Sequence, residues 1–229
     1  MTKVAGSSAV VDDKVGVLRF RVWLKDVSPM VWRRFEVPST LTLQELHGVL
    51  QVVMGWESIH LFMFVIQTAR YGSWETGARS FSVQLAELKL RKGRRFLYEY
   101  DLNIPWEHEV RLEDCQPFDP GTRLPVCTGG DGRCPQENCG GPKGWMWRQD
   151  NALGAEMRED MLTAIGILKE AHDKTSFDAF DDPERIEDLR DALDRIEARS
   201  KWLGSPFERR TVNARLRRDE HLALMHQQM

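Results

Sequence analysis

The sequence predicts an α+β protein: an antiparallel sheet with a packed helix, a cysteine-rich metal-binding loop and a C-terminal helical extension. Three observations indicate this fold class. Several short segments before residue 114 alternate apolar and polar side chains, which is the pattern of half-buried strands. One stretch among them, residues 43–54, instead places its apolar residues at helical spacing. After residue 150 the apolar positions recur at helical spacing only.

Composition and charge narrow the class of protein. The chain has 229 residues, of which 41% are hydrophobic and 29% charged, with a net charge of −3 and a pI of about 6.1. A globally basic nucleic-acid binder is therefore not expected, whereas a local basic patch is compatible with these values. No apolar run approaches the roughly 20 residues that a membrane helix needs. Residues 1–14 are mostly small and polar, so we expect a disordered tail. Residues 1–13 lack a signal-peptide pattern, so we expect a cytoplasmic location.

The predicted core, residues 15–149, begins with two strands. Residues 17–24 alternate apolar and mostly charged side chains, and residues 31–37 alternate again. Ser28-Pro29 separates the two segments, and Pro38 ends the second. Proline removes a backbone donor, so it fits the boundaries of strands better than their interiors.

The helix of the core is predicted from its caps as well as its spacing. Thr42 and Glu45 form a capping-box pattern, in which the hydroxyl and the carboxylate each satisfy a free amide at the helix start. Gly55 supplies a C-terminal stop. The helix, about three turns long, should lie across the sheet.

Three further strands are predicted at residues 61–67, 95–100 and 107–113. Between the first two, residues 70–72 are interpreted as the start of a turn and the stretch to Ser82 as a loop, followed by one helical turn at residues 85–88. In the last strand His108 shares a face with Val110 and Leu112. His108 therefore points to the apolar side of the sheet.

A cysteine-rich loop follows these strands. Cys127, Cys134 and Cys139 lie in a stretch rich in glycine and proline that has little apolar side chain with which to form a core. Zinc prefers four thiolate or imidazole ligands in a tetrahedron, and clustered cysteines in a reducing compartment more often bind metal than form disulfides. We therefore expect a structural zinc, with His108 as the fourth ligand and Cys115 or His60 as alternatives. The competing interpretation is that the thiols are reduced and act as small buried hydrophobes.

The predicted extension, residues 150–229, contains helices around residues 153–168, from Asp182-Pro183 onwards, and at 211–225, with a linker at 172–182. Its first two helices are candidates for a protein-binding or self-association surface. The last region holds the one concentration of basic residues, which are candidate phosphate contacts. They are Arg209, Arg210, Arg215, Arg217 and Arg218. The alternative is a solvated helix face neutralised by Asp219 and Glu220.

An ordered set of motifs resembles the plasmid Ri ORF-3-like family, whose members occur on plasmids and mobile elements and are often labelled resolvase (TnpR). The resemblance covers residues 16–149 and resumes at 202–204 and 212–218, so that residues 150–200 look like a helical elaboration. It implies a compact α+β fold and no established activity. The motifs are Val31-Trp-Arg-Arg34, Leu43-Gln-Glu-Leu-His47, Met54-Gly-Trp56, His60-Leu61 with Phe64, Arg70-Tyr71-Gly72, Tyr100-Asp101, Trp106-Glu-His108-Glu109, Cys127, Cys134-Pro135 and Cys139-Gly-Gly141.

This chain departs from the family pattern in two places. It has Leu102-Asn-Ile-Pro105 where members usually carry Phe-Gly-Asp, and Phe62-Met63 where members often have a second histidine and an acidic residue. An acid–base site built from those family residues would be incomplete here.

Recombinase chemistry is not expected. A serine recombinase needs an activated serine in an arginine-rich setting, but only Ser7 and Ser8 lie near the N-terminus, in a tail without arginine. A tyrosine recombinase needs a tyrosine near its C-terminus, and the last tyrosine is Tyr100. No catalytic residue is therefore assigned.

Two functions fit these observations. The first is a zinc-stapled, non-enzymatic module that binds a protein or nucleic acid in a mobile-element context. The alternative is a metal-dependent hydrolase or nuclease that uses the region of His60, Asp101 and His108. Three cysteines and one further ligand would close the zinc site, which favours the first function, because a catalytic zinc keeps a position open. For His60 a hydrogen-bonded core position is the preferred interpretation, and for His108 a ligand.

Overall fold

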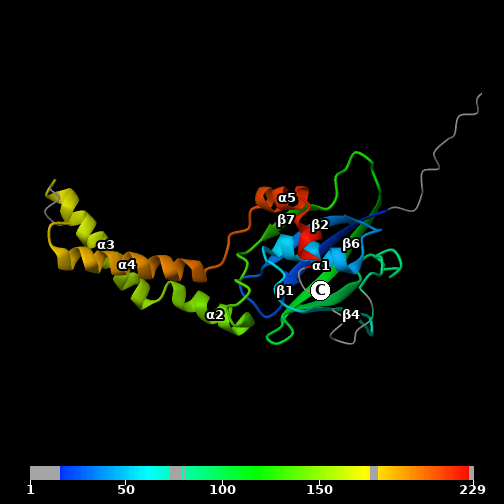
Figure 1. The fold of residues 1–229 in the computed structure, drawn as a ribbon, viewed down its shortest axis with the longest axis horizontal. Coiled ribbons are helices and arrows are strands. Elements are labelled where there is room, and N and C mark those ends of the chain that lie inside the picture. Colours follow the sequence, from blue (N-terminus) through cyan, green and yellow to red (C-terminus); the bar gives the residue numbers. More distant parts are fainter. Residues whose placement is uncertain (1–15, 73–78, 80, 176–179, 227–229) are drawn as a thin grey trace, which may run out of the picture.

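The computed structural model of the chain describes residues 16–72, 79, 81–175 and 180–226. It consists of a core, built on a seven-stranded antiparallel sheet, and a helical arm that projects from one side of that core (Figure 1). The α+β fold class is thereby confirmed. The tail expected at residues 1–14 lies outside the described residues.

The sheet has the strand order β4-β3-β5-β6-β1-β2-β7, and neighbouring strands pair antiparallel throughout. The strands are β1 (Gly16–Leu24), β2 (Trp32–Pro38), β3 (Phe62–Ile66), β4 (Ala69–Gly72), β5 (Arg95–Tyr100), β6 (Trp106–Pro117) and β7 (Val126–Asp131). The five strands predicted from alternation agree with β1, β2, β3, β5 and β6, although β6 extends four residues further.

The two strands that the sequence analysis missed lie at the two edges of the sheet. Residues 70–72, expected to begin a turn, form most of β4 and pair with β3. Residues 126–131, expected to be loop, form β7 and pair with β2, with Cys127 opposite Phe35. Both predictions were wrong because these segments are short and show little apolar alternation, which is the signal of a strand in the sequence. They become strands because a neighbouring strand supplies their backbone hydrogen bonds.

Helix α1 (Leu43–Met54) has the predicted caps. Thr42 and Glu45 form both bonds of the capping box, and Gly55 ends the helix in the left-handed region with φ 85°. The helix connects β2 to β3, which lie near opposite edges of the sheet, so it crosses the strands between them. Its buried polar residues are satisfied, because His47 and Gln51 both bond the hydroxyl of Tyr98 at 2.7 and 2.8 Å.

The C-terminal third of the chain divides between arm and core (Figure 1). The arm consists of α2 (Gly141–Ala152), α3 (Ala155–Asp173) and α4 (Pro183–Trp202), and Asp182 caps α4 as predicted. The expected linker at 172–182 lies partly in α3 and partly outside the described residues. None of the helices in the described ranges is both long and apolar enough to cross a membrane.

The last expected helix is two short helices that return to the core. They are α5 (Arg209–Arg217) and α6 (Glu220–Leu224), separated by Asp219 in the left-handed region at φ 57°. Val212, Leu216 and Leu224 bury their side chains in the main core, so the expected extension is part arm and part core. Apolar spacing alone did not show the break, because it continues across Asp219.

The close approach of α1 and α6 gives a stability prediction. A Cβ atom at Gly48 would lie 2.0 Å from the backbone carbonyl oxygen of His221. We expect Gly48→Ala to displace α6 and to lower the free energy of unfolding by about 1–3 kcal/mol in urea titrations followed by circular dichroism. Gly166, on α3, is the control, because a Cβ there meets nothing within 4 Å. Gly166→Ala should be neutral or stabilising by up to about 1 kcal/mol. Equal losses in both variants would contradict this packing.

Candidate functional site around Arg33, the cysteine loop and α5

The three loop cysteines are buried, and none forms a disulfide. Cys127 lies on β7, where the Asn213 side chain accepts from its backbone N–H at 2.8 Å and donates to its carbonyl at 2.9 Å. Cys134 exchanges two backbone hydrogen bonds with Ser205, at 3.0 and 3.2 Å. Burial raises the pKa of Cys134 to about 12 and also raises the pKa values of Cys127 and Cys139. In this arrangement the thiols are therefore neutral near pH 7.

The side chains expected to ligate zinc do not gather into a metal-binding group. Within the described part of the chain, no three His, Cys, Asp or Glu side chains are arranged to hold an ion. Cys115 is exposed on β6, and His60 lies beside Asp101. The expected zinc, and the choice of its fourth ligand, therefore stay predictions.

His108 lies on the apolar face of β6, as its strand pattern predicted, and is fully buried. Its Nδ1 atom faces the carbonyl oxygens of Trp106 at 2.9 Å and Tyr98 at 3.2 Å, so Nδ1 carries the proton. Nε2 is buried and has no hydrogen-bond partner among the described residues. Trp56 packs edge-to-face against the ring at 5.2 Å between centroids. Burial lowers the pKa of His108 to about 4.

Arg33 is the buried cation nearest these thiols. Its guanidinium donates to four carbonyl oxygens: Val53 at 2.9 Å, Trp32 at 2.8 Å, Asp131 at 2.6 Å and Gly132 at 3.1 Å. The side chain is 1% exposed. Alternation in residues 31–37 places Arg33 on the same face as Val31 and Phe35, which is the sequence signal that identifies a buried arginine here.

The charge of Arg33 is balanced by dipoles and not by a carboxylate. Among the described residues it forms no ion pair. Val53 belongs to the last turn of α1, where the helix dipole concentrates partial negative charge. The Phe207 ring covers the guanidinium at 4.4 Å. Burial lowers the pKa of Arg33, and the nearby Cys134 and Cys127 act in the opposite direction.

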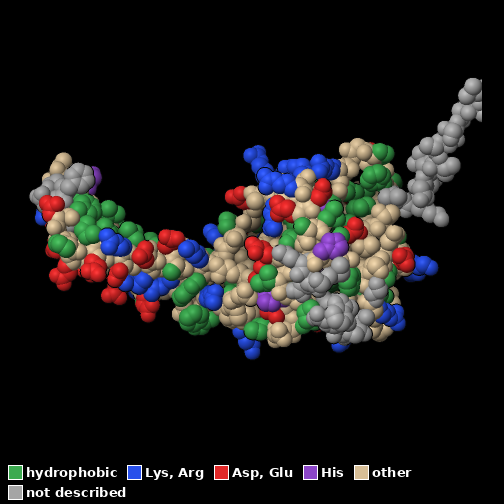
Figure 2. Space-filling model, viewed as in Figure 1, with side chains coloured by type: hydrophobic (Ala, Val, Ile, Leu, Met, Phe, Trp, Pro, Cys, Tyr) green, Lys and Arg blue, Asp and Glu red, His purple; other side chains and the backbone are tan. Residues whose placement is uncertain are grey.

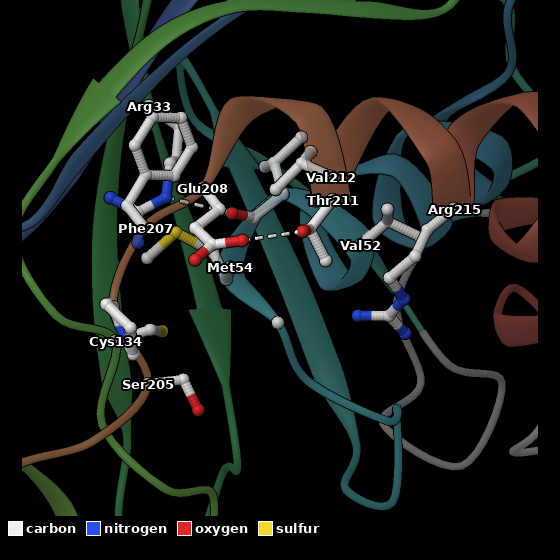
Figure 3. Close-up of a pocket in the computed structure, with 13 residues that line it drawn as sticks. Arg33, Val52, Met54, Cys134, Ser205, Phe207, Glu208, Thr211, Val212 and Arg215 are labelled. Atoms are coloured by element: carbon white, nitrogen blue, oxygen red, sulfur yellow. Dashed lines mark hydrogen bonds between the residues drawn. The ribbon is translucent and has the colours of Figure 1, made fainter.

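A cavity of about 340 Å³ opens beside Arg33, between the end of α1 and the start of α5 (Figure 3). Cys134 and Ser205 lie toward one end of it and Arg215 toward the other (Figure 3). Arg215 is held by Glu220 at 2.6 Å, and the Thr211 hydroxyl donates to Glu208 at 2.9 Å. The cavity is therefore lined mainly by apolar side chains, and its charged groups are largely engaged by the protein itself.

A second group of polar side chains lies where the cysteine loop meets β5. His60 Nδ1 is 3.8 Å from Asp101, and its Nε2 is 2.9 Å from Asn138 Oδ1. The Tyr100 hydroxyl bonds the Glu137 carboxylate, and burial raises the pKa of Tyr100. Of the three residues named for hydrolase chemistry, His60 and Asp101 thus lie together, whereas His108 packs against Trp56 and Tyr98.

Sequence reasoning did not single out His47. It lies on α1 with Nδ1 2.7 Å from the Tyr98 hydroxyl and Nε2 2.7 Å from the Ser58 hydroxyl. Burial lowers its pKa to about 3. Its position four residues after Leu43 and three before Leu50, on the apolar stripe of the helix, indicates burial.

The arginines of α5 form an exposed basic surface (Figure 2). We call the α5 surface the set of exposed arginines on this helix and beside it, which are Arg123, Arg209, Arg210, Arg217 and Arg218. Arg123 joins it because its guanidinium donates to the Arg217 carbonyl at 2.6 Å. None of the five forms an ion pair with a described residue, whereas Arg215, expected to belong to this group, pairs with Glu220.

The fold and the site define an α+β protein whose core buries a cation, three thiols and three histidines and which carries the arginine-rich helix α5. Comparison with known proteins gives the family: the plasmid pRiA4b ORF-3-like protein family matches residues 16–181, and the chain belongs to it. The uncharacterized protein y4hQ of Sinorhizobium fredii is 38% identical over 137 residues, which are 57% of this chain and 70% of that protein.

A solved structure shares the fold. The protein of unknown function MM3350 from Methanosarcina mazei Go1 aligns with a TM-score of 0.58 and 28% identity. The alignment covers 65% of this chain and 87% of that one.

The burial of Arg33 has a consequence for stability that can be measured. We expect Arg33→Met to lower the free energy of unfolding by roughly 3 kcal/mol or more, because four carbonyl oxygens lose their donor at about 1 kcal/mol or more each. The neighbouring Arg34 is the matched control. It is partly exposed and pairs with Glu113 at 2.6 Å, so Arg34→Met should cost less than about 1 kcal/mol. Denaturant titration measures both, and similar losses would contradict the central position given to Arg33.

Proposed function

We propose that the chain is a non-enzymatic binding module that holds a nucleic acid by its phosphates, through the α5 surface. One observation carries this proposal: four exposed arginines on or next to one nine-residue helix have no acidic partner among the described residues. Arginine presents a planar fork of donors that matches a phosphate, and unpaired surface arginines add little to folding.

In the described part of the chain, the acidic residues expected to neutralise this helix face form no ion pair with the five arginines of the α5 surface. The alternative of a self-neutralised helix face relied on Asp219 and Glu220 as local counter-charges. Glu220 is engaged by Arg215 at 2.6 Å, and Asp219 forms no ion pair in the described structure. The positive charge of the α5 surface is therefore local, on a chain whose net charge is −3.

The α5 surface is also held rigidly. The opposite side of α5 buries Val212 and Leu216, and Asn213 clamps the backbone of Cys127 with two hydrogen bonds. A surface fixed before binding loses less conformational entropy when a ligand arrives. The hydrolase alternative has weaker support, because only His60 and Asp101 of its three residues lie together.

A structural zinc at Cys127, Cys134, Cys139 and His108 is a separate part of the proposal. Two features favour it. Burial keeps the Cys127 and Cys134 thiols neutral in this arrangement, and the nearby positive charge of Arg33 acts in the opposite direction, toward the thiolates that bind zinc. His108 directs Nδ1 to carbonyl oxygens and leaves Nε2 unpartnered, which is how metal-ligating histidines are oriented. Binding requires the loop to draw these ligands together, in a cytoplasmic compartment that keeps the thiols reduced.

The nucleic-acid proposal is tested by fluorescence anisotropy with a short labelled DNA duplex. We expect the wild-type chain to bind at low salt and to lose affinity steeply as salt rises, because phosphate contacts release counterions. Replacing Arg209, Arg210, Arg217 and Arg218 together by Gln should weaken binding about tenfold or more.

The matched control removes the same charge elsewhere, by replacing the exposed Lys89, Arg91, Arg94 and Lys143 with Gln. Its affinity should stay close to that of the wild type. If both variants lose the same amount of affinity for DNA, the α5 surface is not the binding site. A wild-type chain that does not bind DNA at low salt would overturn the nucleic-acid function.

Elemental analysis tests the zinc proposal. Protein purified without chelator should carry about one zinc per chain. His108→Ala should lose zinc or bind it weakly, and Cys134→Ser should also lower stability, because metal binding contributes to folding. Cys115→Ser and His60→Ala are controls that should retain the metal. A metal-free wild-type protein, or a site that needs Cys115 and not His108, would contradict the ligand set.

A further inference from the structure

The arm exposes an apolar stripe along α3. Met161 is 44% exposed, Leu162 64%, and Ile165 and Leu168 53% each. Figure 2 shows hydrophobic side chains gathered along this part of the arm. A contiguous exposed apolar surface of this kind on a soluble protein marks an interaction site.

The exposed apolar residues of α3 and α4 share one side of the helical hairpin. On α3 the residues buried against α4 are Met157, Asp160, Ala164 and Ile167, and the exposed stripe follows one position later. On α4 the buried residue is Ala192, and Leu193, one position later, is 48% exposed. Successive side chains on a helix are rotated by about 100°. Because the two helices run antiparallel, the side chain one position after a buried residue points to the same side of the hairpin on both helices.

Ion pairs within the hairpin hold the stripe outward. Asp160 bonds Arg195 at 2.9 Å and Arg199 at 2.5 Å, and Arg199 also pairs with Glu156 at 2.6 Å. Glu170 pairs with Arg185 nearer the tip of the arm. Turning α3 to bury its exposed stripe would break these pairs, so the apolar side must be covered by another molecule.

We propose that a second copy of this chain covers the apolar side, so that two arms form a four-helix bundle around a two-fold axis. The positions 158, 161, 165, 168 and 172 alternate steps of three and four, which is the spacing of a coiled-coil seam. A helical hairpin buries one inner interface only, and two hairpins packed together bury both faces in an antiparallel bundle.

Charge at the ends of the stripe favours a second copy over a different protein. Ile165 lies seven residues after Arg158 and eight before Asp173. When two α3 helices cross antiparallel at Ile165, each residue faces the one equally far beyond Ile165 on the second copy, so Met161 lies opposite Lys169 and next to Leu168. Arg158 then lies opposite the second copy's His172, next to Asp173, and the two-fold axis repeats this arrangement at the other end. Arg158 forms no ion pair with a described residue of its own chain, so it is free to make this contact.

This dimer is independent of the proposed nucleic-acid function, because the stripe and the α5 surface lie on different elements. Sedimentation of the full-length chain over a range of concentrations tests it. We expect a monomer–dimer equilibrium for the wild type. The double variant Ile165→Glu, Leu168→Glu should raise the dissociation constant at least about tenfold, because it places charges in the apolar seam.

Two controls introduce the same charge off the stripe. Leu153→Glu changes an apolar residue that is 71% exposed, and Thr163→Glu changes the opposite side of α3. Both should dimerise like the wild type, and circular dichroism should show all variants equally helical. Arg158→Asp should weaken the dimer, and adding Asp173→Arg should restore it. A wild-type chain that stays monomeric, controls that dissociate like the stripe variant, or a charge swap that restores nothing would overturn the proposal.

Discussion

The position of the cysteine loop and of α5 depends on how the charge of Arg33 is buried. An isolated cation in a protein interior is costly unless its donors are satisfied. Arg33 meets this condition only where the end of α1, the end of β7 and the start of the loop bring their carbonyl oxygens together. The Phe207 ring covers the Arg33 guanidinium, and this contact positions the segment that leads into α5. One side chain thus couples the sheet edge, the main helix and the basic surface.

The loop itself is held by contacts that its composition does not reveal. The Trp56 indole donates to the Pro135 carbonyl at 2.8 Å, Ser205 pairs with the backbone of Cys134, and Asn213 pairs with that of Cys127. These partners come from distant parts of the chain. The expectation of zinc rested on the loop having nothing else to hold it, and these bonds supply a large part of that support. The fold of the loop therefore does not by itself require zinc, and the case for zinc depends on the chemistry of the three thiols.

Helix α1 and the strands β1, β2, β5 and β6 could be predicted from short stretches of the sequence. The caps of α1 and the apolar alternation of the strands are each visible within a few residues. The edge strands β4 and β7 were not, because a neighbouring strand creates them. His108 was correctly placed on the apolar face, but its surroundings are the rings of Trp56 and Tyr98, and strand alternation cannot give the path of a distant loop. Arg33 was detectable from alternation, yet its partners lie on three separate elements.

The arm is joined to the core at one place, and this explains how the two proposed surfaces coexist. Its first helix, α2, and the end of α4 meet at the base, where Gln149 donates to the Trp202 carbonyl at 2.9 Å and the Trp147 and Trp202 rings lie 5.9 Å apart. Because the arm begins and ends at this point, the chain can leave the core after Cys139 and return at Ser205, beside Cys134. The core then closes over Arg33 with α5 and α6 in place, whatever the arm binds. The proposed association through the arm and the proposed phosphate binding through α5 therefore use different elements, α3 with α4 in one case and α5 in the other.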